Sequence, residues 1–260
     1  MSAPCVIHVP PAFDLDALAL IERNILEAAP DASIALDFTA VKTCHAFVLA
    51  RLVSRVAALR REACRGELAR SHGLDPSVPW LAVAAMMRPG DKLASFGALA
   101  RALGNLRDLP WRLLVAGDGS ARGEVETAFA AAIPDRAVFL GALSWSDVAA
   151  AYAAADLCVW PAVNEAYGMA LLEAQAAGVP VVSCATRGVP DVVEHGRTGL
   201  LAPAGDERAL AGLVRELLLD KGKRSRMSAA AMTFAGGERS IESAAVLLGR
   251  LLARFAATPA

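Results

Sequence analysis

The fold is decided by the stretch NEAYGMALLEAQAAG, residues 164–178. It lies between two short apolar runs, DLCVWPA at 156–162 and VPVVSCA at 179–185, which have the length and composition of buried β-strands. From residue 167 onward the stretch has the pattern of a helix. A strand, a helix and a second strand in this order form a right-handed unit with parallel strands, which indicates an α/β protein.

The same alternation extends over residues 80–205. Further strands are predicted at 80–87, 111–117, 137–143 and 199–205, and helices at 93–106, 121–133 and 145–155. Three more helices follow at 207–220, 223–235 and 240–256. Residues 71–260 are therefore predicted to form a Rossmann-like parallel sheet flanked by helices, with a helical C-terminal tail. Polar turns follow several strands, at the edge where such sheets bind ligands.

Residues 1–70 form a separate series. Strands are predicted at 6–10 and 33–39 and helices at 14–29 and 45–62, which gives a small βαβα unit. A loop at 71–79 then leads into the larger domain. Six arginines between residues 51 and 70 are either the solvated face of an amphipathic helix or a patch for peripheral contact with anionic lipid. They are Arg51, Arg55, Arg60, Arg61, Arg65 and Arg70.

Composition excludes several function classes. A net charge of −1 and 5% aromatic residues disfavour nucleic-acid binding. The five cysteines are scattered without paired spacing, which suits a reducing compartment, and the four histidines are too far apart to suggest a metal site. The absence of a long apolar run at the N-terminus or elsewhere predicts a cytoplasmic protein.

Two glutamates frame the expected ligand site. Glu165 lies in the loop after a strand, and Glu173 lies two turns into the following helix. Between them Gly168, Met169 and Ala170 occupy the first helical turn, where free N–H groups and the helix dipole favour a phosphate. Carboxylates accept hydrogen bonds from vicinal hydroxyls, so the pattern suits a nucleotide sugar. The alternative is that Glu165 is only a carboxylate at a helix N-terminus and Glu173 an exposed helix residue.

The run NEAYGMALLEAQAAGVPVV resembles the E-x7-E signature of group 1 (family 4) glycosyltransferases. Further pieces follow in the family's order: LLVAGDGSAR, AVFLGAL, AAYAAADLCVWPA, TRGVPDVVEHGRTGLLAPAGD and RSRM. The resemblance implies the donor half of a GT-B fold, in which two Rossmann-like domains face each other. It also implies retaining, metal-independent transfer from a nucleoside-diphosphate sugar, without a cofactor.

The resemblance also implies roles for particular residues. Glu173 would hold the ribose, Glu165 would face the transferred sugar, and Lys92 would grip the diphosphate, which makes Glu165 and Lys92 the catalytic candidates. Met87 stands where the family has an arginine, and Arg88 lies one residue away. The remaining predicted donor-binding residues are Arg88, Tyr167, Gly168, Met169, Ala170, Gly117, Val138 and Leu140, the last two beside the base. Asp118, Asp191 and Glu194 are interpreted as turn, helix-start and surface residues.

The first 70 residues are too few for the family's acceptor domain, and they lack its glycine-rich loop. They weakly resemble a STAS domain through IALDFTAVKTCHAF, whereas HVPPAFD resembles the P-P-x-x-D linker before the family's donor domain, so a remnant of the acceptor domain is the competing interpretation. We therefore expect a glycosyltransferase that is incomplete as an isolated chain, with an unknown acceptor and a partner chain or homodimer completing the cleft. The alternative is a non-catalytic module that binds nucleotide sugars.

Overall fold

The structure is a computed structural model that describes residues 5–8, 12–13, 20–21, 23, 34–37, 43–44 and 46–256. The contacts within the chain divide it into two compact units, Met1–Glu67 and Leu68–Ala260. Each unit is described by itself.

In the first unit, β1 (Cys5–His8) pairs in parallel with β3 (Ile34–Asp37), and β2 (Ala12–Phe13) pairs in parallel with β4 (Thr43–Cys44). These parallel strands agree with the strands expected at 6–10 and 33–39. Most of the helix expected at 14–29 lies outside the described residues.

Helix α2 (Ala46–His72) continues ten residues beyond the end expected at residue 62, so that prediction was too short. It ends where Gly73 adopts a left-handed φ of 61°. The Leu74 N–H then donates to the Ala69 carbonyl at 3.0 Å, which closes a Schellman cap. Apart from Gly66, good helix formers continue from residue 62 almost to Gly73, and α2 runs through Gly66 without a break.

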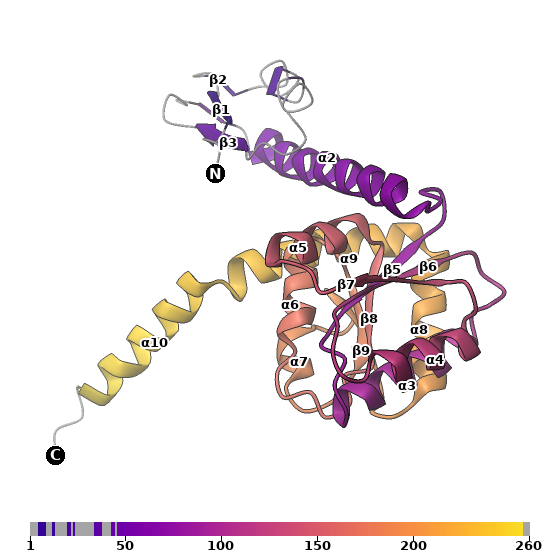
Figure 1. The fold of residues 1–260 in the computed structure, drawn as a ribbon. Helices are drawn as coiled ribbons and strands as arrows, with labels where there is room; N and C mark the ends of the chain where they lie inside the picture. Colours follow the sequence, from indigo (N-terminus) through magenta and orange to yellow (C-terminus); the bar gives the residue numbers. More distant parts are fainter. Residues whose placement is uncertain are drawn as a thin grey trace. The chain divides into compact units, whose positions relative to one another are not determined.

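The second unit contains a parallel six-stranded sheet in the order β10-β9-β8-β5-β6-β7 (Figure 1). The strands are β5 (Trp80–Ala84), β6 (Arg112–Ala116), β7 (Ala137–Gly141), β8 (Leu157–Trp160), β9 (Val181–Cys184) and β10 (Gly199–Ala202). All six coincide with predicted strands. From β5 the chain adds strands outward to β7, returns to β8 beside β5, and adds strands outward on the other side, which is the Rossmann order. The predicted fold class is confirmed.

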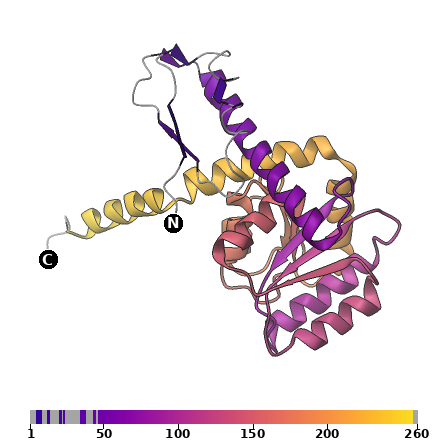
Figure 2. The ribbon, with the colours of Figure 1, turned by 45° about the horizontal axis from the view of Figure 1, so that its top comes forward.

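Helices cover both faces of this sheet. On one face α3 (Asp91–Gly104) packs against α4 (Arg122–Ala132) and α8 (Glu207–Leu219), and α3 and α4 lie side by side in Figure 2. On the other face α6 (Met169–Ala176) packs against α5 (Trp145–Ala154) and α9 (Lys221–Thr233). The remaining helical elements are α7 (Val189–Val192), the π-helical turn η1 (Phe234–Glu238) and α10 (Ile241–Ala256).

The core under α3 is aromatic. Phe96 meets Trp160 edge-on with ring centroids 5.0 Å apart and meets Phe129 in the same manner at 6.1 Å. Because Trp160 is the last residue of β8, this packing ties α3 to the end of the strand from which the loop with Glu165 departs. Among the described helices, none is long and apolar enough to cross a membrane.

Candidate functional site

The sheet has a topological switch point between β5 and β8. These strands are neighbours in the sheet, but the chain leaves β5 toward β6 and leaves β8 toward β9, on opposite sides. The loops that follow the two strands therefore diverge at their carboxyl ends, which is where open α/β sheets bind ligands. The loop after β5 leads to Lys92, and the loop after β8 contains Glu165.

Lys92 and Glu165 form an ion pair across this switch point. The Lys92 Nζ donates to the Glu165 Oε2 at 2.6 Å, and each side chain is 20% exposed. The same ammonium lies 5.5 Å from the centre of the Trp160 ring. The two catalytic candidates are thus held together by a short, half-buried, charge-assisted hydrogen bond.

The loop that carries Glu165 has an unusual backbone. Ala162 and Asn164 adopt left-handed φ angles of 57° and 53°. The Asn164 amide bridges two elements, because it donates to Asp91 Oδ2 at 2.8 Å and accepts from Arg187 Nη1 at 2.9 Å. Ser95 Oγ accepts from the Val163 N–H at 3.0 Å. Such strain persists where surrounding contacts over-determine it and is common at functional sites.

Asn164 did not figure among the candidate residues from the sequence. Asparagine tolerates the left-handed region better than most residues with a side chain. An asparagine four residues after the end of β8 could therefore have indicated a tight turn in the loop before Glu165.

The first turn of α6 presents free backbone donors. Gly168 caps the helix with a φ of 95° and without a side-chain hydrogen bond, and its carbonyl accepts from the Leu171 N–H at 2.9 Å. Within the described part of the chain nothing accepts a hydrogen bond from the N–H groups of Met169 and Ala170. These donors and the helix dipole suit an anion. The adjoining side chains of Tyr167 and Met169 are exposed.

Glu173 lies further along α6 and is half-buried. Desolvation by this burial raises the pKa of its carboxyl group. None of the described residues donates a hydrogen bond to it. Its charge also acts on the Tyr152 hydroxyl and the Cys158 thiol, two buried groups whose pKa values are raised, chiefly by their own burial. A partly desolvated carboxylate without a partner is typical of a site that a ligand completes.

Gly117 lies where the ends of β5, β6 and β7 meet. Gly117 follows β6 with a φ of 129°, and a Cβ there would lie 2.0 Å from the Ala85 carbonyl oxygen. Its N–H donates to the Gly141 carbonyl at 2.8 Å, so the ends of β6 and β7 are joined. A bulge in this pair leaves Leu140 without a register partner, and Val138 and Leu140 are half-buried on the edge strand.

The profile of the family described as "Glycosyl transferases group 1" matches residues 80–220. The chain belongs to the group 1 glycosyltransferases. It is similar to the D-inositol 3-phosphate glycosyltransferase of Mycobacteroides abscessus, with 38% identity over 128 residues, which cover 48% of this chain and 28% of that relative. Curated relatives are matched over about a quarter to a third of their length.

Solved structures agree on the fold. The C-terminal domain of the group 1 family protein LpcC from Francisella tularensis superposes with a TM-score of 0.58 and 18% identity, over 68% of this chain and 93% of that domain. The Anabaena protein HepE, crystallised with UDP and glucose, superposes with a TM-score of 0.64 and 17% identity, over 96% of this chain and 71% of HepE. The second unit has the fold of the C-terminal domain of a GT-B glycosyltransferase.

The chain departs from the expected family pattern beside Lys92. Met87, at the position of the family's arginine, is completely buried, and its backbone pairs with Asp118 and Ala121 at 2.9 Å each. Arg88 is exposed and forms no ion pair with a described residue. The Arg88 guanidinium group is therefore at the surface, and no carboxylate among the described residues fixes its position.

The other acidic candidates have structural partners. Asp118 accepts from the Gly119 N–H at 2.7 Å and from Arg122 Nη1 at 2.9 Å, and these bonds lower its pKa. Asp191 lies in the first turn of α7. Glu194 pairs with Arg197 at 2.7 Å. These placements agree with the turn, helix-start and surface interpretations. Over the described ranges, no group of three or more His, Cys, Asp or Glu side chains is arranged to hold a metal ion.

Proposed function

We propose that the second unit binds a nucleoside-diphosphate sugar and supplies the donor half of a retaining, metal-independent glycosyl transfer. The observation that carries the proposal is the Lys92–Glu165 ion pair at the switch point of the sheet. It places one cation and one hydroxyl acceptor at the edge where this class of sheet binds ligands. Membership of the group 1 glycosyltransferases supports the same conclusion.

Each part of the donor has a chemically matched place. The diphosphate would be held by Lys92 and the free N–H groups of Met169 and Ala170. The ribose hydroxyls would donate to Glu173, whose carboxylate has no partner among the described residues, and the sugar hydroxyls would donate to Glu165. Tyr167 and Gly168 lie directly before these donors in the chain.

The base would lie against the backbone of the edge strand at Val138 and Leu140. Gly117 would form part of the same surface, and it lets the loop after β6 pack directly against the Ala85 carbonyl, where a Cβ would collide. Arg88 would add a second positive charge near the diphosphate.

The proposed chemistry is charge stabilisation. In glycosyl transfer the bond between the sugar and the diphosphate oxygen breaks, and negative charge develops on the departing diphosphate. Lys92 and the α6 amides would meet this charge with donors that are already in place, which is how preorganised sites lower barriers. Glu165 accepts a hydrogen bond from the Lys92 ammonium. The diphosphate would thus take over Lys92 and release Glu165 to the sugar.

A second candidate function is a non-catalytic module that binds nucleotide sugars. The buried Met87 favours it, because the site then has one fixed cation fewer than the family pattern. For the transfer function, we propose that the acceptor domain's side of the cleft comes from a partner chain or a second copy.

Donor binding is tested by measuring melting temperature and heats of binding with UDP, GDP and ADP sugars. We expect at least one nucleotide sugar to raise the melting temperature, because a ligand that binds only the folded state stabilises it by mass action. No shift with any of them at millimolar concentration would contradict both functions. Multiple turnover with any acceptor of a panel would then exclude the binding module, because such a module transfers no sugar.

A further inference from the structure

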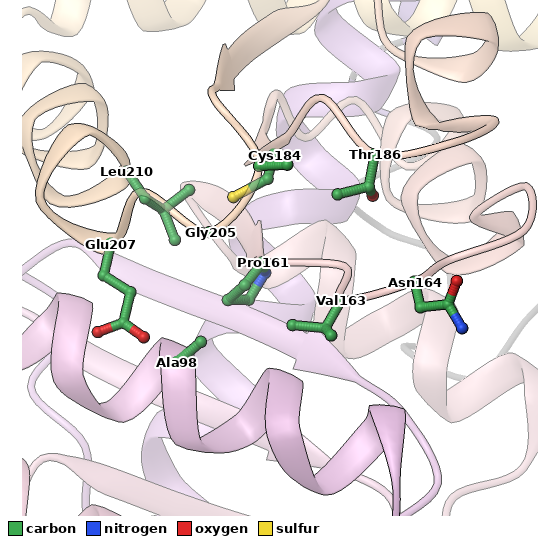
Figure 3. Close-up of a pocket in the computed structure, with 10 residues that line it drawn as sticks. Ala98, Pro161, Val163, Asn164, Cys184, Thr186, Gly205, Glu207 and Leu210 are labelled. Carbon is green, nitrogen blue, oxygen red and sulfur yellow. The ribbon is translucent and has the colours of Figure 1, made fainter.

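A cavity of about 340 Å³ lies at the carboxyl ends of β8, β9 and β10, between α3 and α8 (Figure 3). Its walls include Ala98 of α3, Pro161 and Val163 after β8, Cys184 of β9 and Leu210 of α8. It contains none of the predicted donor-binding residues. Its volume is within the range of small-molecule sites, roughly 300–1,000 Å³.

The polar side chains in the wall are already satisfied by the protein. The Asn164 amide is bonded to Asp91 and Arg187, as described above. The Thr186 hydroxyl donates to the Ala162 carbonyl at 2.7 Å. The Glu207 carboxylate is held by three hydrogen bonds from Arg101, at 2.6 to 3.0 Å.

What the cavity offers to an occupant is therefore mainly apolar. Burial raises the pKa of the Cys184 thiol, which favours its uncharged form. A diphosphate, a ribose or a hexose placed here would give up water without gaining partners. An alkyl chain or a ring would gain the transfer free energy of its buried surface.

The cavity is lined in part by the loop after β8, which carries Glu165. Val163 and Asn164 line it and directly precede Glu165, and Asn164 is bonded to Asp91, the residue before Lys92. An occupant that touches Val163 and Asn164 thus touches the segment that positions both members of the Lys92–Glu165 pair. The cavity therefore lies beside the place where the reacting sugar is expected. Its apolar lining does not suit the donor itself.

We propose that this cavity receives an apolar group of the acceptor, such as the alkyl or aromatic part of an aglycone. The inference rests on the proposed function for the identity of its occupant. Three observations support it. The lining is mainly apolar, the polar side chains in the wall already have partners in the protein, and the loop that carries Glu165 forms part of the wall.

The probe is n-hexyl β-D-glucoside, titrated into the full chain by calorimetry. In Ala98→Leu the new side chain fills the cavity from α3, and we expect affinity for the probe to fall about tenfold because the apolar site is occupied. Ala94→Leu is the matched control, since Ala94 lies on the same helix but is exposed and outside the cavity. Its affinity should stay within about twofold of the unchanged chain. Equal affinities in all three proteins would overturn the proposal.

A second measurement does not depend on the folding of a variant. Cys184 is buried, so iodoacetamide reaches its thiol only when the structure opens locally, and an occupant of the cavity opposes that opening. Saturating hexyl glucoside should therefore slow alkylation of Cys184 at least about threefold, as read by peptide mass spectrometry. Cys64 of α2 lies outside the cavity and is half-buried, so its rate should not change. Unprotected Cys184 in the presence of bound probe would place the probe elsewhere.

The acceptor assignment is tested by adding UDP-glucose. Hexyl glucoside and UDP-glucose should bind together and change each other's affinity by the same factor, because coupling between sites is reciprocal. Probe binding that is lost in Ala98→Leu but has no effect on UDP-glucose would overturn the acceptor assignment. If the probe bound but UDP-glucose did not, the result would count against the proposed function. It would still show that the cavity binds apolar groups.

Discussion

Lys92 and Glu165 neutralise each other at 2.6 Å, although 72 residues separate them in the chain. Both are only 20% exposed, so the pair is screened less than a surface salt bridge. A diphosphate would compete with Glu165 for the same ammonium. Donor binding at this edge of the sheet would then require Lys92 to exchange one anionic partner for another.

Replacing Lys92 by Met should weaken UDP binding by about 1.5–3 kcal/mol, the usual cost of losing a charged hydrogen-bond partner. Replacing Glu165 by Gln should leave UDP binding unchanged or tighter, because the competing carboxylate is gone, while UDP-sugar binding weakens. Calorimetry with both ligands on each variant and on the double variant measures the coupling. Equal losses of UDP and UDP-sugar in Glu165→Gln would contradict the division of roles.

Glu173 should cost stability in the absence of ligand. Burial raises its pKa in the folded state, so the folded state binds a proton more tightly than the unfolded state does. The free energy of unfolding then falls as pH rises from the ordinary pKa of glutamate through the raised one. Glu173→Gln should remove that fall, so that above this window it melts at or above the wild-type temperature.

The same variant should bind UDP more weakly, by about 1.5–3 kcal/mol, if Glu173 holds the ribose. Glu216→Gln is a matched control, because Glu216 is a surface carboxylate of α8 paired with Lys223. A Glu173→Gln protein that is less stable at neutral pH, yet binds UDP normally, would assign Glu173 a structural role.

Removal of divalent metal should leave donor binding unchanged. In the proposed function, Lys92 and the backbone N–H groups of α6 balance the charge of the diphosphate. The Asp118 carboxylate already accepts hydrogen bonds from Gly119 and Arg122. Titration of a nucleotide sugar with and without EDTA is the measurement. If binding required magnesium or manganese, Asp118 would be the first ligand to replace, and the metal-independent mechanism would be wrong.

The sheet could be predicted from the sequence because each of its strands is short and bounded by turns, and most of them are buried and apolar. Glu165, Glu173 and Lys92 could be named from motif positions, but the contact between Lys92 and Glu165 could not. It depends on β8 returning beside β5, which is a property of strand order rather than of either segment. The cavity beside Ala98 was likewise missed, because its lining residues come from five separate segments of the chain.

Gly117 should tolerate no side chain. A Cβ there would lie 2.0 Å from the Ala85 carbonyl oxygen, and the φ of 129° is unfavourable for any other residue. Gly117→Ala should lose at least about 2 kcal/mol of unfolding free energy, because backbone has to move to make room. Gly123→Ala, in α4 with open space around its Cα, should be neutral or stabilising. Urea unfolding of both variants decides this, and equal effects would refute the close approach.

Asn164 allows backbone strain and hydrogen bonding to be separated in the loop that carries Glu165. Its φ of 53° costs an ordinary residue about 1 kcal/mol or more, whereas glycine adopts it freely. Asn164→Ala should lose both the relaxed backbone and the bridge to Asp91 and Arg187. Asn164→Gly should lose only the bridge, and so should be more stable than Asn164→Ala.

If the bridge positions Glu165, both Asn164 variants should bind UDP-sugar more weakly than wild type while retaining bare UDP, since Glu165 is assigned to the sugar. Restoration of sugar binding in Asn164→Gly alone would mean that backbone conformation, not the bridge, sets the position of Glu165. Unfolding curves and calorimetry on the same two proteins give both answers. A loss of UDP binding equal to the loss of UDP-sugar binding would show that Asn164 acts on the α6 phosphate donors instead.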